Sequence, residues 1–506
     1  MITLKQFYEK AGVKAPCLEV TENVNIILRN GYGELVEPRP DQYQGLNKCL
    51  TENRFGLFDD PGVGKTVVAQ AYAIHKVLTG KKVLVLMPPI LLYQFDESLC
   101  ETFEGIENHL TRHILDDSPA ERALLEEGWK EHGYPDILSA TPQMFYKYWN
   151  VLREQYTVLV ADEVHKYLTQ AEAGIYKRIA AFLGGWEDSE CVLMTGTPLG
   201  NELTQAYGLT KLLNPGAYFD YKTFEREHCV YKTIMLKEPK RLKNGKLQTS
   251  MRILNGYKNV VKLEKSLYRR ARRVIKEDVL SLETPAIDVI PVQLYPEHLR
   301  LYQELSKKRV LELDEGEVFT TLQDQALRQA ILQLVSSPQK YVGKGVKVRN
   351  IIVEATKDFI VEAGDSKVIV FANYLETAAT LTEALAEYNP AVLNGSVNDK
   401  QKQRDKFLSD DSCRVLIAHP NSAGVGLNLQ SVSNYVIFAE PCSVPGDFKQ
   451  AFERVYRGGQ LNKVTVKILK ALHTGAVKSV ENMFRKADDI QMVNRDRVSM
   501  MSYING

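Results

Sequence analysis

One stretch of the chain has the residue types and spacing that hold the phosphates of a nucleotide. It reads Asp59-Asp60-Pro61-Gly62-Val63-Gly64-Lys65-Thr66. The backbone amides of a tight glycine turn can point at phosphate oxygens, a lysine ammonium can reach the β- and γ-phosphates, and a threonine hydroxyl can ligate Mg²⁺. We therefore predict that a nucleotide is bound by Gly62, Val63, Gly64, Lys65 and Thr66. Asp59 departs from the pattern, which has glycine at its first position.

The segments on either side of this turn have the form that such a site needs. The apolar run 54–58 precedes it and predicts a buried strand, and apolar residues recur at helical spacing over 67–78. The phosphates would then lie at a helix N-terminus, where the free amides and the helix dipole favour negative charge. An ordinary strand–turn–helix loop is the alternative interpretation, and it is weighed against the rest of the chain.

Acidic residues follow a second predicted strand, the apolar run 157–161. They are Asp162 and Glu163, in the sequence Asp162-Glu163-Val164-His165. A nucleotide-hydrolysing fold holds its magnesium at such a strand end, and the adjacent acid can orient or deprotonate the attacking water. We predict that Thr66 and Asp162 ligate the metal and that Lys65, Asp162 and Glu163 are catalytic. A plain acidic turn is the alternative, and the alternating β/α pattern around it favours the nucleotide site.

Two parallel sheets are the elements expected to position these residues. Apolar runs at 82–87, 136–139, 157–161 and 191–195 alternate with helical stretches, which predicts a doubly wound α/β lobe with its sites at the carboxyl ends of the strands. Thr195-Gly196-Thr197-Pro198 ends the last of these strands and could sense the γ-phosphate. Runs at 289–294, 367–371, 390–393, 414–418, 435–438 and 464–469 predict a second α/β lobe, which has no phosphate loop.

The predicted boundaries follow from this alternation. We expect a preface over 1–36, a first lobe over 37–215, a basic helical insert over 216–283, a second lobe over 284–482 and a tail over 483–506. In the second lobe, Arg454 and Arg457 lie three apart, which would place them on one face of a helix. Arginines in a lobe without its own phosphate loop favour fingers that complete the first lobe's site. Two solvated arginines on a surface helix are the alternative.

Composition narrows the class of protein. The 506 residues are 44% apolar and 25% charged, as in globular proteins, and no apolar run approaches the roughly 18 residues that read as a membrane-spanning helix. The charged N-terminal sequence lacks the apolar core of a signal peptide, so the cytoplasm or nucleoid is expected. Seven cysteines lie far apart without any C-x-x-C, which predicts buried thiols rather than a zinc ribbon or disulfide framework.

Positive charge gathers in one segment, although the net charge is only +1. Residues 221–280 hold 17 Lys and Arg against 6 Asp and Glu. A solvated helical face is one interpretation; contact with a nucleic-acid backbone is the interpretation that we favour. Within this segment the expected contacts are four arginines, Arg269, Arg270, Arg272 and Arg273.

Taken together, the motifs resemble those of the superfamily-two helicase-like ATPases. In chain order they are Gln42-x-x-Gly45-Leu46, the phosphate loop, Asp162-Glu163-Val164-His165, Thr195-Gly196-Thr197-Pro198, Asn394-Gly395-Ser396, Gly424-Val425-Gly426-Leu427-Asn428-Leu429 and Gln450-x-x-x-Arg454-x-x-Arg457-x-x-Gln460. The Swi/Snf branch is the closer resemblance, because it accepts Asp in the phosphate loop and has counterparts of Lys211-Leu212-Leu213-Asn214-Pro215 and Arg457-Gly458-Gly459-Gln460. The branch also has an Arg-Arg…Lys-Glu-Asp-Val brace between its lobes, so a structural brace is the alternative role for the arginine cluster. The resemblance covers residues 38–475.

This resemblance implies two RecA-like lobes of the P-loop NTPase kind that close on ATP and Mg²⁺. It adds Gln42, Gly426 and Gln450 to the expected nucleotide-binding residues, and the Gln42 amide could read an adenine edge. It also implies a nucleic-acid strand held by both lobes, with contacts at Pro88, Ser139, Thr141, Asn373 and Ser422.

The sequence thus predicts an ATP-driven DNA translocase or helicase of bacterial or phage kind, acting on duplex or branched DNA in remodelling, branch migration or protein displacement. A monomer is expected, with proteins of replication, recombination or transcription as possible partners. Two alternatives stay open. One is an RNA-directed or RNA-polymerase-associated ATPase of the same architecture. The other is a catalytically idle DNA-binding clamp, which would have no need of Lys65, Asp162, Glu163, Arg454 and Arg457 together.

Overall fold

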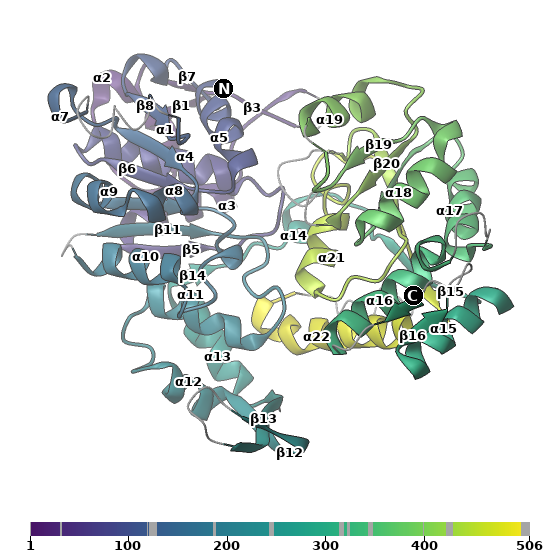
Figure 1. The fold of residues 1–506 in the computed structure, drawn as a ribbon. Coiled ribbons are helices and arrows are strands. Elements are labelled where there is room, and N and C mark those ends of the chain that lie inside the picture. The colour runs from purple at the N-terminus through teal and green to yellow at the C-terminus, as the bar shows by residue number, and fades with distance from the viewer. Residues whose placement is uncertain are drawn as a thin grey trace. The chain divides into compact units, whose positions relative to one another are not determined.

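Two units divide the chain in the computed structural model (Figure 1). Unit 1 comprises Met1–Arg29, Leu35–Lys276 and Asp489–Arg497, and unit 2 comprises Asn30–Glu34, Glu277–Asp488 and Val498–Gly506. The structure describes residues 2–30, 33–118, 120, 129–185, 189–241, 247–312, 318–320, 324–342, 348–397, 399–420 and 429–496.

A seven-stranded parallel sheet forms the centre of unit 1, in the order β14-β5-β11-β10-β6-β9-β8. Its strands are β5 (Arg54–Leu57), β6 (Val83–Leu86), β8 (Arg112–Ile114), β9 (Ile137–Ala140), β10 (Val158–Ala161), β11 (Glu190–Met194) and β14 (Ala271–Arg272). The five strands that the sequence predicts for this lobe are all present. The sequence did not predict the two edge strands, β8 and β14, because each is too short and too polar to give a recognisable strand pattern.

Helices cover both faces of this sheet, so its strands are buried on both sides. In β6, Leu84 and Leu86 belong to one apolar core, whereas Val83 and Val85 belong to the other. This explains why the central strands read as continuous apolar runs. The helices of unit 1 are α1 (Leu4–Lys10), α2 (Leu18–Thr21), α3 (Pro40–Thr51), α4 (Lys65–Leu78), α5 (Pro89–Thr102), α7 (Trp129–His132), α8 (Pro142–Lys147), α9 (Trp149–Gln155), α10 (Gly174–Gly185), α11 (Ala206–Leu213), α12 (Tyr221–His228) and α13 (Val260–Leu267).

The N-terminal residues up to Arg29, which show little periodicity, fold onto unit 1. The short strands β1 (Ile2–Thr3) and β2 (Asn25–Ile26) join β7 (Phe103–Glu104) in an antiparallel sheet, and β3 (Leu28–Arg29) pairs with β4 (Leu35–Val36). Tyr8 of α1 is buried, and its hydroxyl donates a hydrogen bond to the carbonyl of Ala71 at 2.8 Å. Helix α1 is therefore tied to α4, the helix that follows the phosphate loop.

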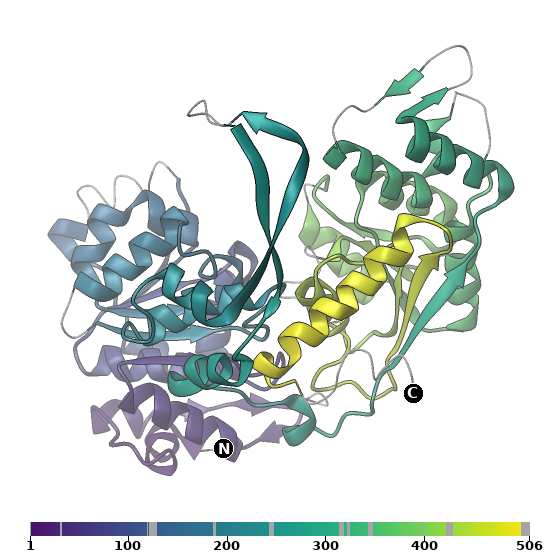
Figure 2. The ribbon, with the colours of Figure 1, turned by 90° about the horizontal axis from the view of Figure 1, so that it is seen from below.

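The basic segment contains a long antiparallel hairpin that the helix-prone sequence did not predict. Strands β12 (Cys229–Arg241) and β13 (Leu247–Tyr257) stand out from the body of unit 1 as a twisted ribbon (Figure 2). Helices α12 and α13 lie at either end of the hairpin in the chain, so the expected helices are present around it. Helix α14 (Lys276–Val279) runs from unit 1 into unit 2.

Unit 2 is built on a six-stranded parallel sheet, in the order β15-β22-β21-β18-β20-β19. The strands are β15 (Ala286–Val292), β18 (Lys367–Phe371), β19 (Ala391–Leu393), β20 (Val415–Ala418), β21 (Ser433–Phe438) and β22 (Thr465–Ala471). All six correspond to predicted strands. Alternate residues of β18 again enter two different cores, Val368 and Val370 on one face and Ile369 and Phe371 on the other.

Helices pack on both faces of this second sheet as well. They are α15 (Pro296–Lys308), α16 (Asp324–Ser336), α17 (Ile351–Glu362), α18 (Leu375–Ala384), α19 (Lys400–Ser409), α21 (Pro445–Phe452) and α22 (Gly475–Asn494), and a small hairpin joins β16 (Val310–Glu312) to β17 (Val318–Thr320). The predicted fold class of two parallel α/β lobes is confirmed. Among the described helices, none is long and apolar enough to cross a membrane.

Candidate nucleotide-binding site

The phosphate loop connects β5 to α4 at the carboxyl edge of the unit 1 sheet. Gly62 and Gly64 both have φ of +83°, a left-handed conformation that favours glycine, and α4 begins at Lys65. A Cβ built on Gly64 would lie 2.3 Å from the Gln42 amide nitrogen, so this position has no room for a side chain. The loop therefore has the tight backbone and the helix N-terminus that the sequence predicts for a phosphate site.

Lys65 points back over the loop that precedes it. Its ammonium donates hydrogen bonds to the carbonyl oxygens of Asp59 at 2.6 Å and Asp60 at 3.0 Å. Desolvation lowers the pKa of Lys65, and the carboxylates of Asp162, Asp59 and Glu163 oppose that shift. A cation held beside several carboxylates is positioned to meet a phosphate that enters the loop.

Acidic residues at the end of β10 form the second part of the site. Burial raises the pKa of Asp162 to about 7, with a further contribution from Glu163 and opposition from Lys65. The Glu163 amide donates to Asp162 Oδ1 at 2.7 Å, and Glu163 has φ of +49°, which is uncommon for a residue with a side chain. Backbone strain of this kind is frequent at functional sites.

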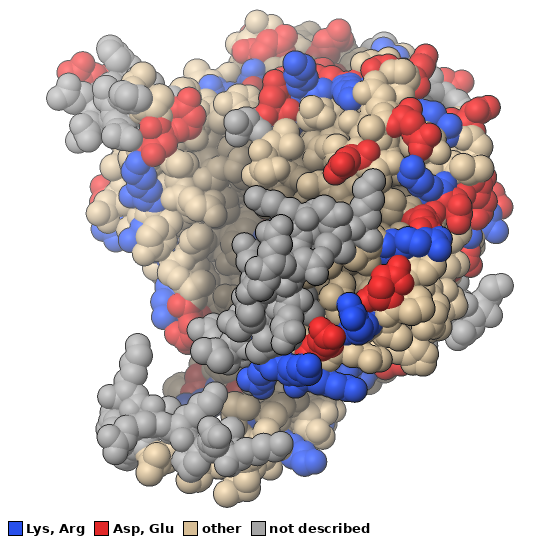
Figure 3. Space-filling model, turned by 45° about the vertical axis from the view of Figure 1, so that its right-hand side comes forward, with Lys and Arg blue, Asp and Glu red and all other residues tan. Residues whose placement is uncertain are grey.

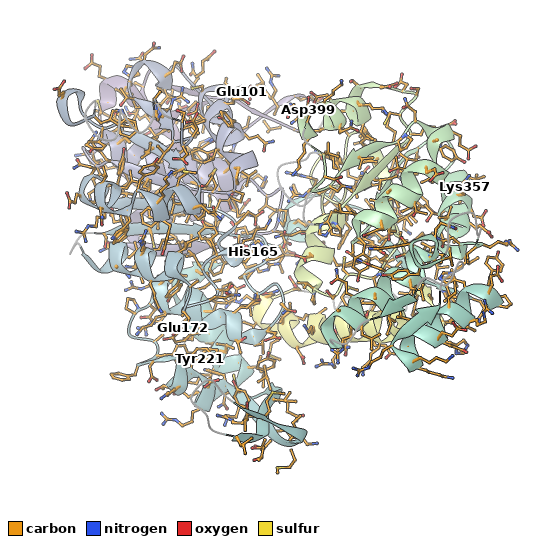
Figure 4. All side chains as sticks on the ribbon, in the orientation of Figure 1. Glu101, His165, Glu172, Tyr221, Lys357 and Asp399 are labelled. Atoms are coloured by element: carbon orange, nitrogen blue, oxygen red, sulfur yellow. The ribbon has the colours of Figure 1, made fainter. Side chains whose placement is uncertain are left out.

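His165 links this acidic turn to the end of the neighbouring strand, β11. Its Nδ1 lies 3.3 Å from Glu163 Oε2 and is hydrogen-bonded to Thr195 Oγ1 at 2.8 Å; the residue is labelled in Figure 4. Burial lowers the pKa of His165 to about 4, so the ring is neutral at physiological pH. Neutral His165 therefore lies between Glu163, the predicted base, and the Thr195 turn. The sequence pattern assigned no role to His165.

The Thr195 turn also touches the phosphate loop directly. A Cβ built on Gly196 would lie 2.7 Å from both Cγ and Cδ of Pro61. The Thr197 amide donates to Thr195 Oγ1 at 3.1 Å, which fixes the turn. Only glycine at position 196 allows this close approach. A displacement of the phosphate loop would therefore move the Thr195 turn as well.

Gln42 lies at the N-terminus of α3, beside the phosphate loop. Its side-chain oxygen accepts a hydrogen bond from the Arg39 amide at 2.8 Å, and the Arg39 guanidinium donates to the Val63 carbonyl. The structure thus brings Gln42 to the loop, where its amide oxygen caps α3. Recognition of adenine by Gln42 stays a prediction.

Two of the four arginines expected to contact nucleic acid instead bind the acids of the phosphate loop. Arg272 Nη2 donates to Asp59 Oδ2 at 2.6 Å, and Arg273 Nη2 donates to Asp60 Oδ1 at 2.6 Å. The side chain of Arg273 is 1% exposed and that of Arg272 is 16% exposed. The expectation of a nucleic-acid contact is therefore wrong for Arg272 and Arg273, because burial and ion pairing occupy both guanidiniums. Arg269 is exposed, and Arg270 lies 4.0 Å from Glu52.

This pairing explains the departure at Asp59. The segment after β14 runs beside the loop, where the Asp60 amide donates to the Val274 carbonyl at 2.9 Å and the Val274 amide donates to Asp59 Oδ1 at 2.8 Å. Burial raises the pKa of Asp59, and Arg272 opposes the shift. An acid at position 59 is thus a fixed anchor between the loop and this segment.

A third acid reaches Arg273 from the C-terminal part of unit 1. Asp496 Oδ1 accepts from Arg273 Nη2 at 2.6 Å, and the side chain of Asn494 exchanges hydrogen bonds with the backbone of Leu199 at 3.0 and 3.2 Å. Burial alone would lower the pKa of Arg273, but the carboxylates of Asp60 and Asp496 raise it above its usual range. No sequence signal identified Asp496 or Asn494, because their partners lie far away in the chain.

The predicted residues of unit 2 surround the end of α21. Gln450 is buried in the helix, whereas Arg454 and Arg457 follow its last residue, Phe452, in turns. The expectation that both arginines share a helical face is wrong, since the helix ends before either. Burial, with a contribution from Arg454, lowers the pKa of Arg457 to about 10, so Arg457 remains cationic at neutral pH. Gly426 lies outside the described residues.

The remaining nucleic-acid candidates differ in exposure. Pro88 is half-buried at the start of α5, and Thr141 is half-buried and caps α8 through a hydrogen bond from the Met144 amide at 3.1 Å. Asn373 is half-buried and donates to the Pro441 carbonyl at 3.1 Å. Ser139 is 2% exposed within β9, which argues against a direct contact there. Ser422 lies outside the described residues.

The donor set of unit 1 fits a magnesium nucleotide. Carboxylate and hydroxyl oxygens are ligands that Mg²⁺ prefers, and Asp162 and Thr66 supply one of each. The raised pKa of Asp162 marks a surplus of buried negative charge that a divalent cation would neutralise. Bound Mg²⁺ would polarise the phosphate oxygens; Lys65 would hold the terminal phosphates and Glu163 would orient the attacking water.

Comparison with known proteins identifies the family. A model of the SNF2-related domain matches residues 46–343, and one of the helicase conserved C-terminal domain matches residues 351–459. The "Uncharacterized ATP-dependent helicase YqhH" of Bacillus subtilis is 23% identical over 86% of this chain and 76% of its own length. The mouse "DNA annealing helicase and endonuclease ZRANB3" is 23% identical over 85% of this chain, which spans 38% of that relative.

A solved structure, the SWI2/SNF2 ATPase core of Sulfolobus solfataricus in complex with dsDNA, is similar at 21% identity with a TM-score of 0.38, over 92% of this chain and 94% of that one. The family assignment rests on the domain models, since the SNF2-related model alone matches more than half of the chain. The protein therefore belongs to the SNF2-related, Swi/Snf-type helicase-like ATPases of superfamily two.

Proposed function

We propose that this protein is an ATP-driven DNA translocase that moves on duplex or branched DNA to remodel, branch-migrate or displace what is bound there. The single observation that carries the proposal is the meeting of Lys65, Asp162 and Glu163 around a loop built for phosphate. A clamp that only binds DNA has no use for a half-buried lysine among carboxylates, because that arrangement serves phosphoryl transfer.

Hydrolysis would proceed with each residue in a separate role. The amides of Gly62 to Thr66 would bind the phosphates, Lys65 would neutralise the charge on the terminal phosphate, and Glu163 would act on the water. His165, held neutral by burial, would keep Glu163 oriented and report its position to Thr195 through the 2.8 Å hydrogen bond.

DNA is the proposed track because of the relatives and the charge pattern. The mouse relative is named as a DNA annealing helicase, and 17 of the 23 charged residues in 221–280 are basic. Basic charge attracts any nucleic-acid backbone, so RNA is separated from DNA only by experiment. The activity is proposed for the cytoplasm, at the nucleoid.

The test is the steady-state ATPase rate without nucleic acid and then with duplex DNA, single-stranded DNA, forked DNA and RNA. We expect duplex and forked DNA to raise kcat most, and the Lys65→Ala variant to show no activity with any of them. Stimulation by RNA alone would replace the DNA track with an RNA-directed activity. A wild-type protein that binds duplex DNA without hydrolysing ATP would be an idle clamp.

A further inference from the structure

A hollow lined mainly by basic residues lies at the base of the β12–β13 hairpin, in unit 1. Its volume is about 530 Å³, and it is lined by Lys222, Glu225, Arg226, Cys229, Tyr231, Arg252 and Lys258. Three chain segments bring these residues together: helix α12, the start of β12 and the end of β13. Tyr221, the first residue of α12, is labelled in Figure 4.

The local geometry directs the cations into this hollow. Lys222 and Arg226 are four residues apart on α12, so they share one face, opposite the buried Phe224. On the hairpin, Arg252 pairs with Thr233, and its guanidinium lies over the Tyr231 ring at 4.2 Å from the centroid. Stacking of this kind holds the guanidinium flat and leaves its N–H groups available at the edge.

Among the described residues, Asp220 and Glu227 lie near the two cations of α12, but no acid forms a close ion pair with the four cations of the hollow. Lys222, Arg226, Arg252 and Lys258 are exposed, and none forms an ion pair within 4.0 Å with an acid among the described residues. Glu225, the acid of the hollow, accepts a hydrogen bond from the Tyr231 hydroxyl. The hollow therefore carries an excess of positive charge.

The base of the hairpin is fixed to unit 1 by an aromatic cluster. Phe224 and His228 of α12 are buried, with ring centroids 5.1 Å apart, and the Tyr218 hydroxyl is hydrogen-bonded to His228 Nε2 at 2.9 Å. Tyr207 of α11 contacts Phe224 at 5.5 Å. These rings pack α12 against α11, so the backbone that carries Lys222 and Arg226 is fixed to unit 1.

We propose that this hollow binds the phosphodiester backbone of a nucleic acid. Four exposed cations on a fixed concave surface match a polyanion with repeated charges, and contacts to phosphates carry no sequence preference. On the face seen in Figure 3, basic and acidic side chains are interspersed, whereas the lining of the hollow has four basic residues and one acidic residue. This inference rests on the proposed function and assigns its DNA contact to residues other than the arginines that brace the phosphate loop.

The test compares the full-length protein with the double variant Arg226→Glu/Arg252→Glu. Binding of a fluorescent duplex DNA and of an RNA duplex of the same sequence is measured by anisotropy over a series of salt concentrations. Loss of two phosphate contacts should flatten the log–log salt slope for DNA by about 1.8, at about 0.9 per phosphate. We expect Kd at low salt to rise at least ~10-fold on the same grounds. The basal ATPase rate without nucleic acid should stay at the parental value.

Lys232→Glu is the matched control, because Lys232 is an exposed cation on the same hairpin. It neighbours Tyr231 on β12, so its side chain points to the opposite face of the ribbon. Its DNA affinity and salt slope should equal those of the wild type. A neutral pair, Arg226→Gln/Arg252→Gln, should give a smaller loss in the same direction and serves if charge reversal prevents folding.

If the wild type binds duplex DNA and the Arg226/Arg252 variants bind it with the same affinity and salt slope, the hollow is not the binding site. The proposed function would be unaffected by that result. An equal loss in Lys232→Glu would also overturn this site, because general charge and not the hollow would then explain the binding. Absence of duplex binding and of stimulation in the wild type would overturn the proposed function as well. Tighter binding of RNA than of DNA would keep the phosphate site and change its ligand.

Discussion

Arg273 donates to Asp60 through a 2.6 Å ion pair that is almost completely shielded from water. The same guanidinium donates to the Phe58 carbonyl at 2.7 Å and to the Gly196 carbonyl at 3.1 Å. One side chain thus joins the phosphate loop to the Thr195 turn.

Removal of this side chain should destabilise unit 1 and its nucleotide site together. Arg273→Ala would leave Asp60 buried without its partner, which costs about 3–5 kcal/mol for pairs of this kind. Arg273→Lys should lose less, since it keeps the charge but not the planar fork. Urea unfolding and ATP binding are the measurements, with exposed Arg269→Ala as the control. Unchanged stability in Arg273→Ala would mean that the ion pair contributes nothing.

Hydrolysis should respond differently to two residues of the site. Lys65→Ala should abolish ATP hydrolysis through lost phosphate positioning. Glu163→Gln should keep ATP bound while lowering kcat by about 10²-fold or more, as expected when a general base is lost. Equilibrium ATP binding and single-turnover rates separate the two effects. Parental turnover in Glu163→Gln would remove Glu163 from the mechanism.

Contact between Gly196 and Pro61 predicts a steric effect on the loop. Gly196→Ala would place a methyl group 2.7 Å from a proline ring, so the loop or the turn must shift. Overpacking of this kind typically costs about 1–3 kcal/mol, and we expect the KM for ATP to rise. Gly184→Ala in α10 is the control, because a Cβ there meets no atom within 4 Å. Equal KM values in the two variants would contradict the contact.

A buried acid of unit 2 predicts a pH effect on stability. Burial raises the pKa of Glu440 from 4.5 to about 6, against hydrogen bonds from Ser336, Thr377 and the Asn373 amide. Below pH 4.5 the carboxyl is protonated in both states; between pH 4.5 and about 6 the unfolded chain releases its proton first, so stability falls as pH rises.

The contribution lost over this window is about 2 kcal/mol, from 1.36 kcal/mol per pKa unit. The melting temperature measured from pH 4 to 8 should therefore show a decline that is absent in Glu440→Gln. Parallel pH profiles for the two proteins would show that Glu440 does not titrate in this range.

The arginines after α21 are expected to act on the transferred phosphate, as the motif resemblance implies. Arg454→Ala and Arg457→Ala should each lower kcat, by up to about 10³-fold for a true arginine finger. Lysine at either position should not restore the rate, because it lacks the planar fork. Wild-type kcat in both alanine variants would assign these residues to structure alone.

The phosphate loop and the parallel strands could be predicted from the sequence, because their signals are local. The phosphate loop is a contiguous motif, and strands such as β6 are buried on both sides, so their patterns are continuous and easy to read. The hairpin escaped prediction because exposed lysines and threonines, such as Lys232 and Thr233, break the alternation of a strand. The spacing of Arg454 and Arg457 suits one face of a helix, but it does not report that α21 ends at Phe452.

The acids that pair with Arg272 and Arg273 could not be predicted, for a different reason. Asp59 and Arg272 are separated by 213 residues, so no local pattern joins them. The sequence nevertheless held an indication of this pairing. An acidic residue such as Asp59, buried where the motif has glycine, needs a cation nearby, and the arginine cluster at 269–273 could supply one. Nucleic-acid contact was the favoured role for the whole basic segment, whereas the structure divides the segment between ion pairing and an exposed surface.

Unit 1 is completed by residues that are synthesised after the whole of 277–488. Ile490 and Val493 enter its core, and Asn494 and Asp496 bind Leu199 and Arg273. On the ribosome, the nascent first lobe must wait for these residues, and until they emerge Arg273 has Asp60 but lacks its second acid. A fragment cut at Lys276 would preserve this immature state, so truncation at the apparent lobe boundary would yield a less stable protein than the same lobe in the full chain.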